Sequence, residues 1–577
     1  MAEDPGERWR ARALALAATA VALGLQVAPI LAHPTSTALG APAGEGMAHL
    51  WGLATAAAGL PDHGPFLRVS TLAAFPEGVR LDLVDPAHLL VLAPLWWAAG
   101  LPGAAAGWNL LAPLHLLLLA GGTWLLARRL SPVPMVAALA TAGAVATPSW
   151  WGMLPLGRSE LLGLGLIPLV LALLDRALLH RALLDPSLAL PARRRAGALA
   201  ILTLVLLAHC GWQPLMQAGL ILAPATLVLA RVRRVPVRWL VPGLAAVLLP
   251  AAALCLPMLV VQLQTHPWWL ARAGGLAVLG ADAPAVDLLG TLRLAGLRPF
   301  LATAVPPYPG LVATLLCGLA LRRQPHRAWA LLALGLLLLG LGPRVQLGPD
   351  AVARIGPAWL LAKLVPPLGG LSDWGRLALG AGPLLALAGA LGLSPWLSGR
   401  RGALLAAGLA ALLLLDGLSY RPDAPGRFEV APPAALVAVY QALPAGPVLE
   451  LPGIAPDERA AQEDNDRSLL WTLSHGHPVQ AAPSPASGDL LRRSLLLRVH
   501  KDVRPHADAC TRTEGARLHA MGFRSVLLLG DRLEPGQAGP VEAAVARVLG
   551  PPAGQDGPTW WWTLRGGPLG PPACRAP

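Results

Sequence analysis

The apolar positions of this chain gather in long runs that short polar segments separate. About eleven runs approach the length of a helix that crosses a membrane, which is roughly 20 residues. Several runs are shorter than that and would need residues from their flanks. The expected spans are 14–31, 104–127, 133–148, 161–174, 196–209, 215–230, 239–261, 300–321, 328–341, 377–396 and 403–418. We therefore predict an α-helical polytopic membrane protein.

Arginines fall in clusters between these runs and predict the orientation of the chain. The clusters are Arg8, Arg10 and Arg12; Arg128 and Arg129; Arg193, Arg194 and Arg195; Arg231, Arg233, Arg234 and Arg238; Arg322, Arg323 and Arg327; and Arg400 and Arg401. Cytoplasmic loops of membrane proteins collect lysine and arginine. These clusters therefore predict a cytoplasmic N-terminus and an outer C-terminal region, in the cytoplasmic (inner) membrane of a cell.

The apolar run 88–100 decides the parity of the spans. If it crossed the membrane, Arg128 and Arg129 would lie outside. If it is a juxtamembrane or re-entrant helix, about 19 arginines fall in roughly 59 cytoplasmic residues, against about 10 arginines and lysines in about 160 outer residues. We therefore predict that 88–100 does not cross.

The composition of the sequence changes after about residue 420, where glycine, proline and acidic residues become more frequent. Short β-like segments occur at 447–451, 525–529 and 560–564, and helical patterns at 434–443, 489–499, 514–521 and 541–548. This alternation indicates a small α/β domain. The predicted organisation is a transmembrane domain, 1–420, with a long first outer loop, 33–103, followed by an extracytoplasmic domain, 421–577.

The composition agrees with a membrane protein. The 577 residues are 55% hydrophobic and only 13% charged, and the formal net charge is +13. In a soluble protein this charge would suggest a nucleic-acid partner. Here most basic residues lie beside apolar spans, so we attribute the charge to topology and to anionic lipid headgroups, and expect membrane lipids but no nucleic acid as partners.

The first outer loop carries the main candidate for acid–base chemistry. Glu45 and His49 are four residues apart, so on a helix they would share one face. A carboxylate at the membrane surface can act as a general base on a hydroxyl. The alternative is that both are solvated loop residues.

Two further polar clusters lie in later outer loops. Arg158 and Glu160 precede the span 161–174, where an ionisable side chain is costly and suggests function, although a helix N-terminus also favours glutamate. Asp373 and Arg376 precede the span 377–396. Arginine there can hold a lipid-linked phosphate through its planar guanidinium, or it can pair with Asp373 or with headgroups.

Metal and redox chemistry receive little support from the sequence. The pair His209–Cys210 lacks neighbouring ligand residues, and no zinc-type spacing occurs, so no metal or cofactor is expected. Cys510 and Cys574 both lie beyond the last span, where an oxidising compartment would permit a disulfide between them. We expect that disulfide.

The chain resembles the GT-C superfamily of polytopic glycosyltransferases, over most of residues 1–420 in topology and over residues 40–175 in sequence pattern. The resemblance rests on an acidic residue just past the first span, an amphipathic segment from Asp85-Pro86 to Pro94-Leu95, and a span ending in Arg128-Arg129-Leu130. The tail is similar to that of bacterial GT-C-like proteins, in the strand 448–452 and in Ser474-His475-Gly476-His477-Pro478. Where the family usually has Gly-Asp, this chain has Gly44-Glu45.

This resemblance implies transfer of a sugar from a polyprenyl-phosphate donor to an acceptor on the outer face. Glu45 would be the base, Glu160 a second carboxylate, and Arg376 a partner of the phosphate; His49, Arg158 and Asp373 would help to bind substrate. Two alternatives stay open. One is a non-catalytic scaffold with GT-C architecture, favoured by the glutamate at position 45. The other is a lipid or solute transporter, disfavoured because no repeat symmetry and no ionisable group in mid-span are found.

The predicted topology can be tested by cysteine accessibility labelling. A thiol introduced near Asp185 should react only from the cytoplasm, and one near Gln462 only from outside, because arginine-rich loops stay in the cytoplasm. Labelling of the first from outside, or of the second only from the cytoplasm, would contradict the topology.

Overall fold

The computed structural model describes residues 4–40, 46–63, 70, 72–73, 75, 85–153, 157, 159–179, 190–265, 286–287, 310–324, 326–346, 354–365, 374–419, 426–452, 459–481 and 509–567. The chain forms two compact units. Unit 1 contains Met1–Ala32, Asp85–His88 and Asn109–Gly426, and unit 2 contains His33–Val84, Leu89–Trp108 and Arg427–Pro577. Unit 2 therefore combines the predicted first outer loop with the C-terminal region.

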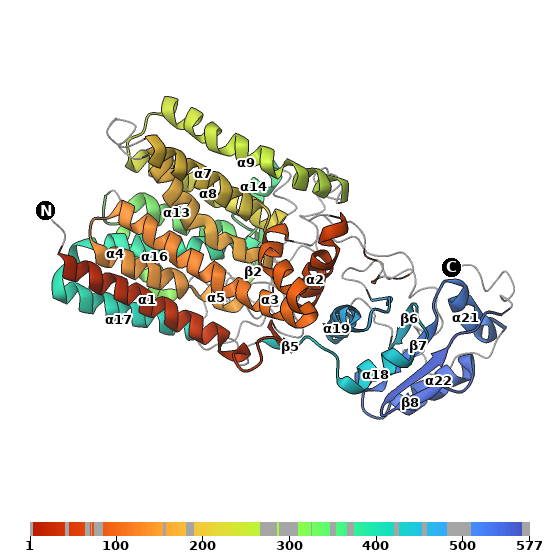
Figure 1. Ribbon diagram of the computed structural model, residues 1–577. Helices are drawn as coiled ribbons and strands as arrows, with labels where there is room; N and C mark the ends of the chain where they lie inside the picture. Colours follow the sequence, from red (N-terminus) through yellow and green to blue (C-terminus); the bar gives the residue numbers. More distant parts are fainter. Residues whose placement is uncertain are drawn as a thin grey trace. The chain divides into compact units, whose positions relative to one another are not determined.

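Unit 1 is a bundle of helices (Figure 1). Each of the eleven predicted spans overlaps a described helix. The main helices of unit 1 are α1 (Pro5–Val27), α4 (Pro134–Val145), α5 (Pro148–Met153), α6 (Ile167–Leu174), α7 (Leu190–Ala208), α8 (Trp212–Val232), α9 (Val237–Thr265), α12 (Leu311–Ala320), α13 (Arg327–Gly340), α14 (Trp359–Leu364), α16 (Leu377–Gly392) and α17 (Gly399–Ser419). Short 3-10 segments are η1 (Ala28–Ile30), η3 (Ser159–Leu166), η7 (Trp374–Arg376) and η8 (Ser394–Trp396), and the π-helix η4 (Asp175–Leu179) follows α6. Strands β2 (Val286–Asp287), β3 (Arg344–Gln346) and β4 (Arg354–Ile355) form a small sheet.

Among the described helices, six are long and apolar enough to cross a membrane, by length and composition. They include α1, α8, α9 and α17, and two shorter apolar helices, α12 and α13, accompany them. The chain is a multi-pass membrane protein.

Helix α16 lies at the centre of unit 1, and all of its residues are buried. A helix that is apolar on every side is stable only when other helices surround it. Here α4, α12 and α13 pack against it. Small residues permit the close approach: a Cβ on Gly389 would lie 2.8 Å from Leu316 Cβ, and one on Gly392 would lie 2.9 Å from Ala320 Cα.

Helix α3 (Pro86–Leu130) is a hairpin of two limbs. Its backbone reverses at Gly100, where φ is 60° and ψ is −136°. The limbs touch closely, since a Cβ on Gly103 would lie 1.8 Å from Leu95 O and one on Gly107 would lie 3.0 Å from Leu92 Cα. The first limb, 86–99, is shorter than the roughly 20 residues of a spanning helix. This geometry fits a helix that does not cross, and the membrane placement stays a prediction.

The arginine clusters gather at one end of unit 1. Asp175, after α6, is fully buried and accepts hydrogen bonds from Arg129 Nε at 2.5 Å and Arg233 Nε at 2.8 Å, so the ends of α3, α6 and α8 lie together. At the start of α17, the amide of Gly399 donates to Glu7 of α1. We call this end, defined by Glu7, Arg129, Asp175, Arg233 and Gly399, the arginine end.

The opposite end of unit 1 contains the other ends of the same helices. The side chain of Asp416, near the end of α17, accepts a hydrogen bond from the amide of Val312 at 2.9 Å. A Cβ on Gly310 would lie 3.1 Å from Pro148, just after α4. Since α4 begins four residues after α3 ends, its start lies at the arginine end. The contacts fit the predicted alternation of loops, while the side of the membrane stays a prediction.

Unit 2 is an α/β unit around a four-stranded sheet. The strands are β6 (Val448–Leu451), β7 (Ser525–Leu529), β8 (Gly554–Asp556) and β9 (Thr559–Thr563), and its helices are α2 (Gly46–His63), α18 (Ala434–Ala442), α19 (Arg459–His475), α21 (Ala509–Ala520) and α22 (Ala538–Leu549). The strand order is β6-β7-β9-β8, with only β6 and β7 parallel. In sequence, helix α21 lies between β6 and β7, and the 3-10 turn η11 (Gly530–Arg532) and helix α22 lie between β7 and β8. Phe523, Val545 and Trp562 share one apolar core.

Segments far apart in sequence meet within unit 2. Strand β1 (Thr37–Leu39) pairs with β5 (Arg427–Glu429) in an antiparallel register. Trp51 of α2 donates to Thr472 of α19 at 3.1 Å, and Trp108 donates to the carbonyl of Leu39 at 2.8 Å. Both indoles are buried, so each N–H needs such an acceptor.

A buried polar cluster holds β6 to its neighbours. Glu450 accepts hydrogen bonds from the hydroxyls of Tyr440 and Ser468, and Arg532 Nη1 donates to Ser468 Oγ at 2.6 Å. The backbone of Glu450 exchanges two hydrogen bonds with the side chain of Gln480, at 2.9 and 2.7 Å. Burial and the Glu450 carboxylate raise the pKa of Tyr440 well above its usual value. Because the Glu450 carboxylate is paired inside the unit, we assign this cluster a structural role.

His475 and His477, which belong to the tail segment that resembles GT-C-like proteins, lie beside this cluster. The His475 ring stacks on Tyr440 with ring centroids 3.8 Å apart, and its Nδ1 accepts a hydrogen bond from the amide of His477. Burial lowers the pKa of His475 to about 4, although the charge of Glu450 opposes the shift. The folded unit therefore holds the neutral imidazole.

Replacement of Asp175 should destabilise unit 1. In Asp175→Asn, the partly buried guanidinium groups of Arg129 and Arg233 lose their charged partner, which should cost less than the roughly 3–5 kcal/mol of a fully buried pair. We expect a lower thermal unfolding midpoint in detergent than for the wild type. Asp556→Asn, the same change at an exposed strand residue, is the control and should leave the midpoint unchanged. Equal midpoints for Asp175→Asn and the control would contradict the assignment.

Unit 2 should lose stability in acid because of His475. An unfolded histidine has a pKa near 6.5, so stability present above that pH is lost as the pH falls toward 4, by at most about 3 kcal/mol. His475→Gln removes this titration and should flatten the pH dependence of the unfolding midpoint between pH 6.5 and 4. His519→Gln in α21 is the matched control and should keep the wild-type slope. An unchanged slope in His475→Gln would show that His475 does not titrate this way.

Candidate functional site

Four of the eight predicted site residues lie outside the described part of the chain. These are Glu45, Arg158, Asp373 and Cys574. Glu160 lies in η3 and Cys510 in α21, but their side chains are not described. The proposed convergence of Glu45, Glu160 and Arg376, and the Cys510–Cys574 disulfide, therefore stay predictions.

Two predicted residues are described together with their surroundings. His49 lies in the first turns of α2, in unit 2, and is partly buried. Arg376 ends η7 immediately before α16, in unit 1, and only 5% of it is exposed. A guanidinium buried to this degree in an apolar unit needs an anionic or hydrogen-bonding environment.

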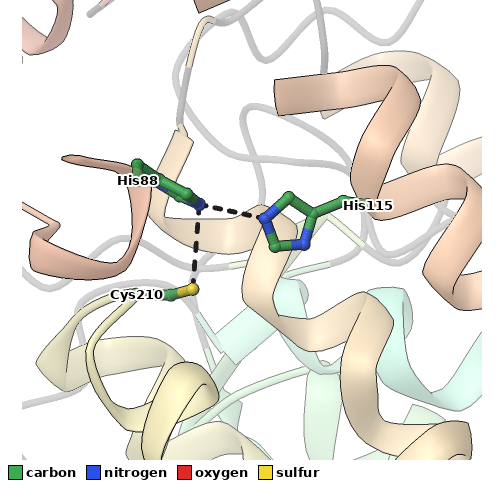
Figure 2. Close-up of side chains that lie close together, drawn as sticks. All are labelled: His88, His115 and Cys210. Carbon is green, nitrogen blue, oxygen red and sulfur yellow. Dashed lines mark hydrogen bonds between the residues drawn. The ribbon is translucent and has the colours of Figure 1, made fainter. Parts of the chain in front are cut away.

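A cluster that the sequence did not predict lies in unit 1, away from the arginine end. His88 begins the first limb of α3, His115 lies in the second limb, and Cys210 lies in the turn between α7 and α8. His88 Nε2 is 3.0 Å from His115 Nε2 and 3.7 Å from Cys210 Sγ (Figure 2). We call these three residues the His–His–Cys cluster. They are 2%, 5% and 1% exposed.

Local structure explains why these three side chains meet. The reversal at Gly100 brings residues before it against residues after it, so His88 faces His115 although 27 positions separate them. The glycines of η3 make room for the third residue: a Cβ on Gly163 would lie 2.7 Å from Cys210 Cβ. The Cys210 turn is also tied to α3 by the hydrogen bond from Ala87 N to His209 O.

Asp85 lies beside Nδ1 of His88, the ring nitrogen that does not face the other two residues of the cluster, and orients the ring. Its Oδ2 lies 3.2 Å from His88 Nδ1 and accepts a hydrogen bond from Ser159 Oγ at 2.7 Å. A buried carboxylate beside Nδ1 favours the tautomer with the proton on that nitrogen, which leaves a lone pair on Nε2. That lone pair faces both His115 and Cys210. The three ligand atoms lie within 4.8 Å of one another, so this arrangement suits one shared positive centre.

Sequence reasoning missed this cluster for two reasons. Cys210 has no ligand residue close to it in sequence, because its partner His88 is 122 positions away. The prediction that mid-span positions carry no ionisable group is wrong for His115, which lies in the middle of the predicted span 104–127. A buried histidine in a membrane span is a signal of function by default, and it could have identified the site.

Comparison with known proteins supports the fold. No family model and no curated protein matches the chain. Among solved structures it is similar to ArnT from Cupriavidus metallidurans, in the apo state and bound to undecaprenyl phosphate. Both matches are 14% identical and cover 96% of this chain and 99% of that chain, with TM-scores of 0.50 and 0.52.

A third similar structure is the Archaeoglobus fulgidus oligosaccharyltransferase in complex with Zn and sulfate. It is 11% identical over 93% of this chain and 70% of that chain, with a TM-score of 0.44. The ArnT matches extend over nearly the whole of both chains. The chain therefore has the same fold as ArnT.

Proposed function

We propose that this protein transfers a sugar from a polyprenyl-phosphate donor to an acceptor at the outer face of the cytoplasmic membrane. The observation that carries the proposal is the fold similarity to ArnT across nearly the whole of both chains. The ArnT structure bound to undecaprenyl phosphate supports a lipid-linked phosphate as the donor class.

Arg376 is the residue that we propose to hold the donor phosphate. It lies buried immediately before α16, a helix whose residues are all buried. Its planar guanidinium can form paired hydrogen bonds with a phosphate and can offset the negative charge that develops on it as it leaves. Arg158 and Asp373 are proposed to assist in substrate binding, with His49.

Glu45 is the proposed general base. Its carboxylate would accept the proton of the acceptor hydroxyl while that oxygen attacks the anomeric carbon of the sugar. The new carbon–oxygen bond would form as the bond between the anomeric carbon and the phosphate oxygen breaks. The polyprenyl phosphate would leave with both electrons of that bond, and the configuration of the sugar would invert. Glu160 would serve as a second carboxylate near the acceptor.

The alternative from another class is a membrane scaffold that keeps the GT-C fold without catalysis. It is motivated by glutamate at position 45, where the family usually has aspartate. A shift of about 1 Å in a catalytic base can cost on the order of 100-fold in rate. A transporter is a weaker alternative, although the buried His115 removes one argument that had disfavoured it.

The test is transfer from a panel of polyprenyl-phosphate sugars, measured as release of polyprenyl phosphate by the purified full-length protein. Glu45→Gln should lower turnover at least about 100-fold, because the amide cannot accept the proton. Glu45→Asp should keep activity, since it restores the residue usual in the family. Glu534→Gln, an equivalent change at an exposed position of unit 2, is the control and should turn over like the wild type.

Two results would contradict the proposal in different ways. Equal turnover by the wild type and Glu45→Gln would remove Glu45 from the mechanism. Absence of turnover by the wild type with every donor would favour the scaffold, provided that the protein is folded by its thermal unfolding transition.

A further inference from the structure

We propose that the His–His–Cys cluster of His88, His115 and Cys210 is a zinc site. Zinc binds imidazole nitrogen at about 2.0–2.1 Å and thiolate sulfur at about 2.3 Å, in tetrahedral geometry. These bond lengths place two nitrogen ligands about 3.3 Å apart and a nitrogen and a sulfur about 3.6 Å apart. The distances from His88 Nε2 are 3.0 Å to His115 Nε2 and 3.7 Å to Cys210 Sγ, each within a few tenths of an ångström of these values. All three ligand atoms lie within 4.8 Å of one another, so closing the His115–Cys210 side around an ion needs a shift of at most about 1.2 Å.

The donor set selects the class of ion. Two imidazoles and a thiolate are ligands for zinc and other borderline or soft transition metals, whereas magnesium and calcium require oxygen ligands. Within the described residues, this is the one group of three or more metal-ligating side chains whose ligand atoms converge. The ion's positive charge would also keep Cys210 as a thiolate in an apolar setting, where a lone thiolate would be costly.

His88 already has a carboxylate beside its other ring nitrogen. Metal-bound histidines usually donate their other ring N–H to a carboxylate, which fixes the tautomer and the direction of the ring. Asp85 does this for His88 and also accepts a hydrogen bond from Ser159. A chain of contacts therefore runs from η3, through Asp85 and His88, to the ligand atoms.

The site is placed to fasten three segments of unit 1. The ligands come from the two limbs of α3 and from the α7–α8 turn, and all three are almost fully buried. Three protein ligands leave one position of a tetrahedral zinc ion for water. The ion would hold the hairpin against the turn, and this role does not depend on the proposed transfer reaction.

The first test is the metal content of the full-length protein, purified without a histidine tag and analysed by inductively coupled plasma mass spectrometry. We expect about one zinc per chain in the wild type. Cys210→Ser and His115→Gln should carry at least about 10-fold less, because each removes one of three ligands. Asp85→Asn keeps the ligands but loses the orienting carboxylate, and should weaken zinc affinity about 10- to 100-fold.

His209→Gln is the matched control. His209 is adjacent to Cys210, but its Nδ1 lies 2.8 Å from the carbonyl of Val205 and it is not part of the cluster. This variant should retain the zinc of the wild type. Loss of zinc in His209→Gln equal to that in Cys210→Ser would indicate that disruption of the turn, rather than loss of a ligand, removes the metal, and would overturn the assignment.

A second measurement does not depend on the folding of variants. The wild-type protein, stripped by a chelator and loaded with Co²⁺, should show the thiolate-to-cobalt charge-transfer absorption of a cysteine ligand, and its thermal unfolding midpoint should rise on addition of zinc. A folded wild type that carries no zinc and shows no such absorption would reduce the cluster to a hydrogen-bonded group. Copper in place of zinc in the purified protein would equally overturn the proposal.

Discussion

The fold depends on one constraint: a polar group buried in an apolar helical unit must find its partner inside that unit. Asp175 meets this constraint by accepting from arginines at the ends of two other helices. Asp85 meets it through His88 and Ser159. In each case the partners come from different helices, so the polar contact also fixes how those helices are arranged. The apolar surfaces permit many packings, and these few polar groups select among them.

Much of unit 1 could be predicted because its signal is local. An apolar run such as 377–396 predicts a helix from its composition alone, and α16 occupies most of it. In the C-terminal region, the predicted strand 525–529 coincides with β7. Helix α19 was missed, since its first half is almost wholly polar and carries no apolar period. Strands β1 and β5 were missed because each has three residues and is defined only by the other, far along the chain.

The candidate site could be predicted only in part, for a related reason. Glu45, Glu160 and Arg376 were chosen by their positions at the ends of spans, which the sequence reveals. The His–His–Cys cluster depends instead on the reversal at Gly100 and on close packing of η3 against the α7–α8 turn. Neither feature produces a periodic pattern in the sequence, and a glycine in an apolar run does not by itself predict a hairpin. The buried histidine in mid-span was the remaining sign that the sequence offered.

Ser159 links the His–His–Cys cluster to the segment that carries Glu160, the proposed second carboxylate. Ser159 begins η3 and donates to Asp85, and Glu160 is the next residue in the chain. Since Asp85 also orients His88, a metal ion bound by His88 would restrain Asp85, and through it the backbone that carries Glu160. A protein that must present a carboxylate beside a lipid-linked substrate gains from such restraint, because catalytic groups act only when they are held in the correct geometry. The metal site would then stabilise the loop without contacting substrate, which separates its role from that of the proposed base.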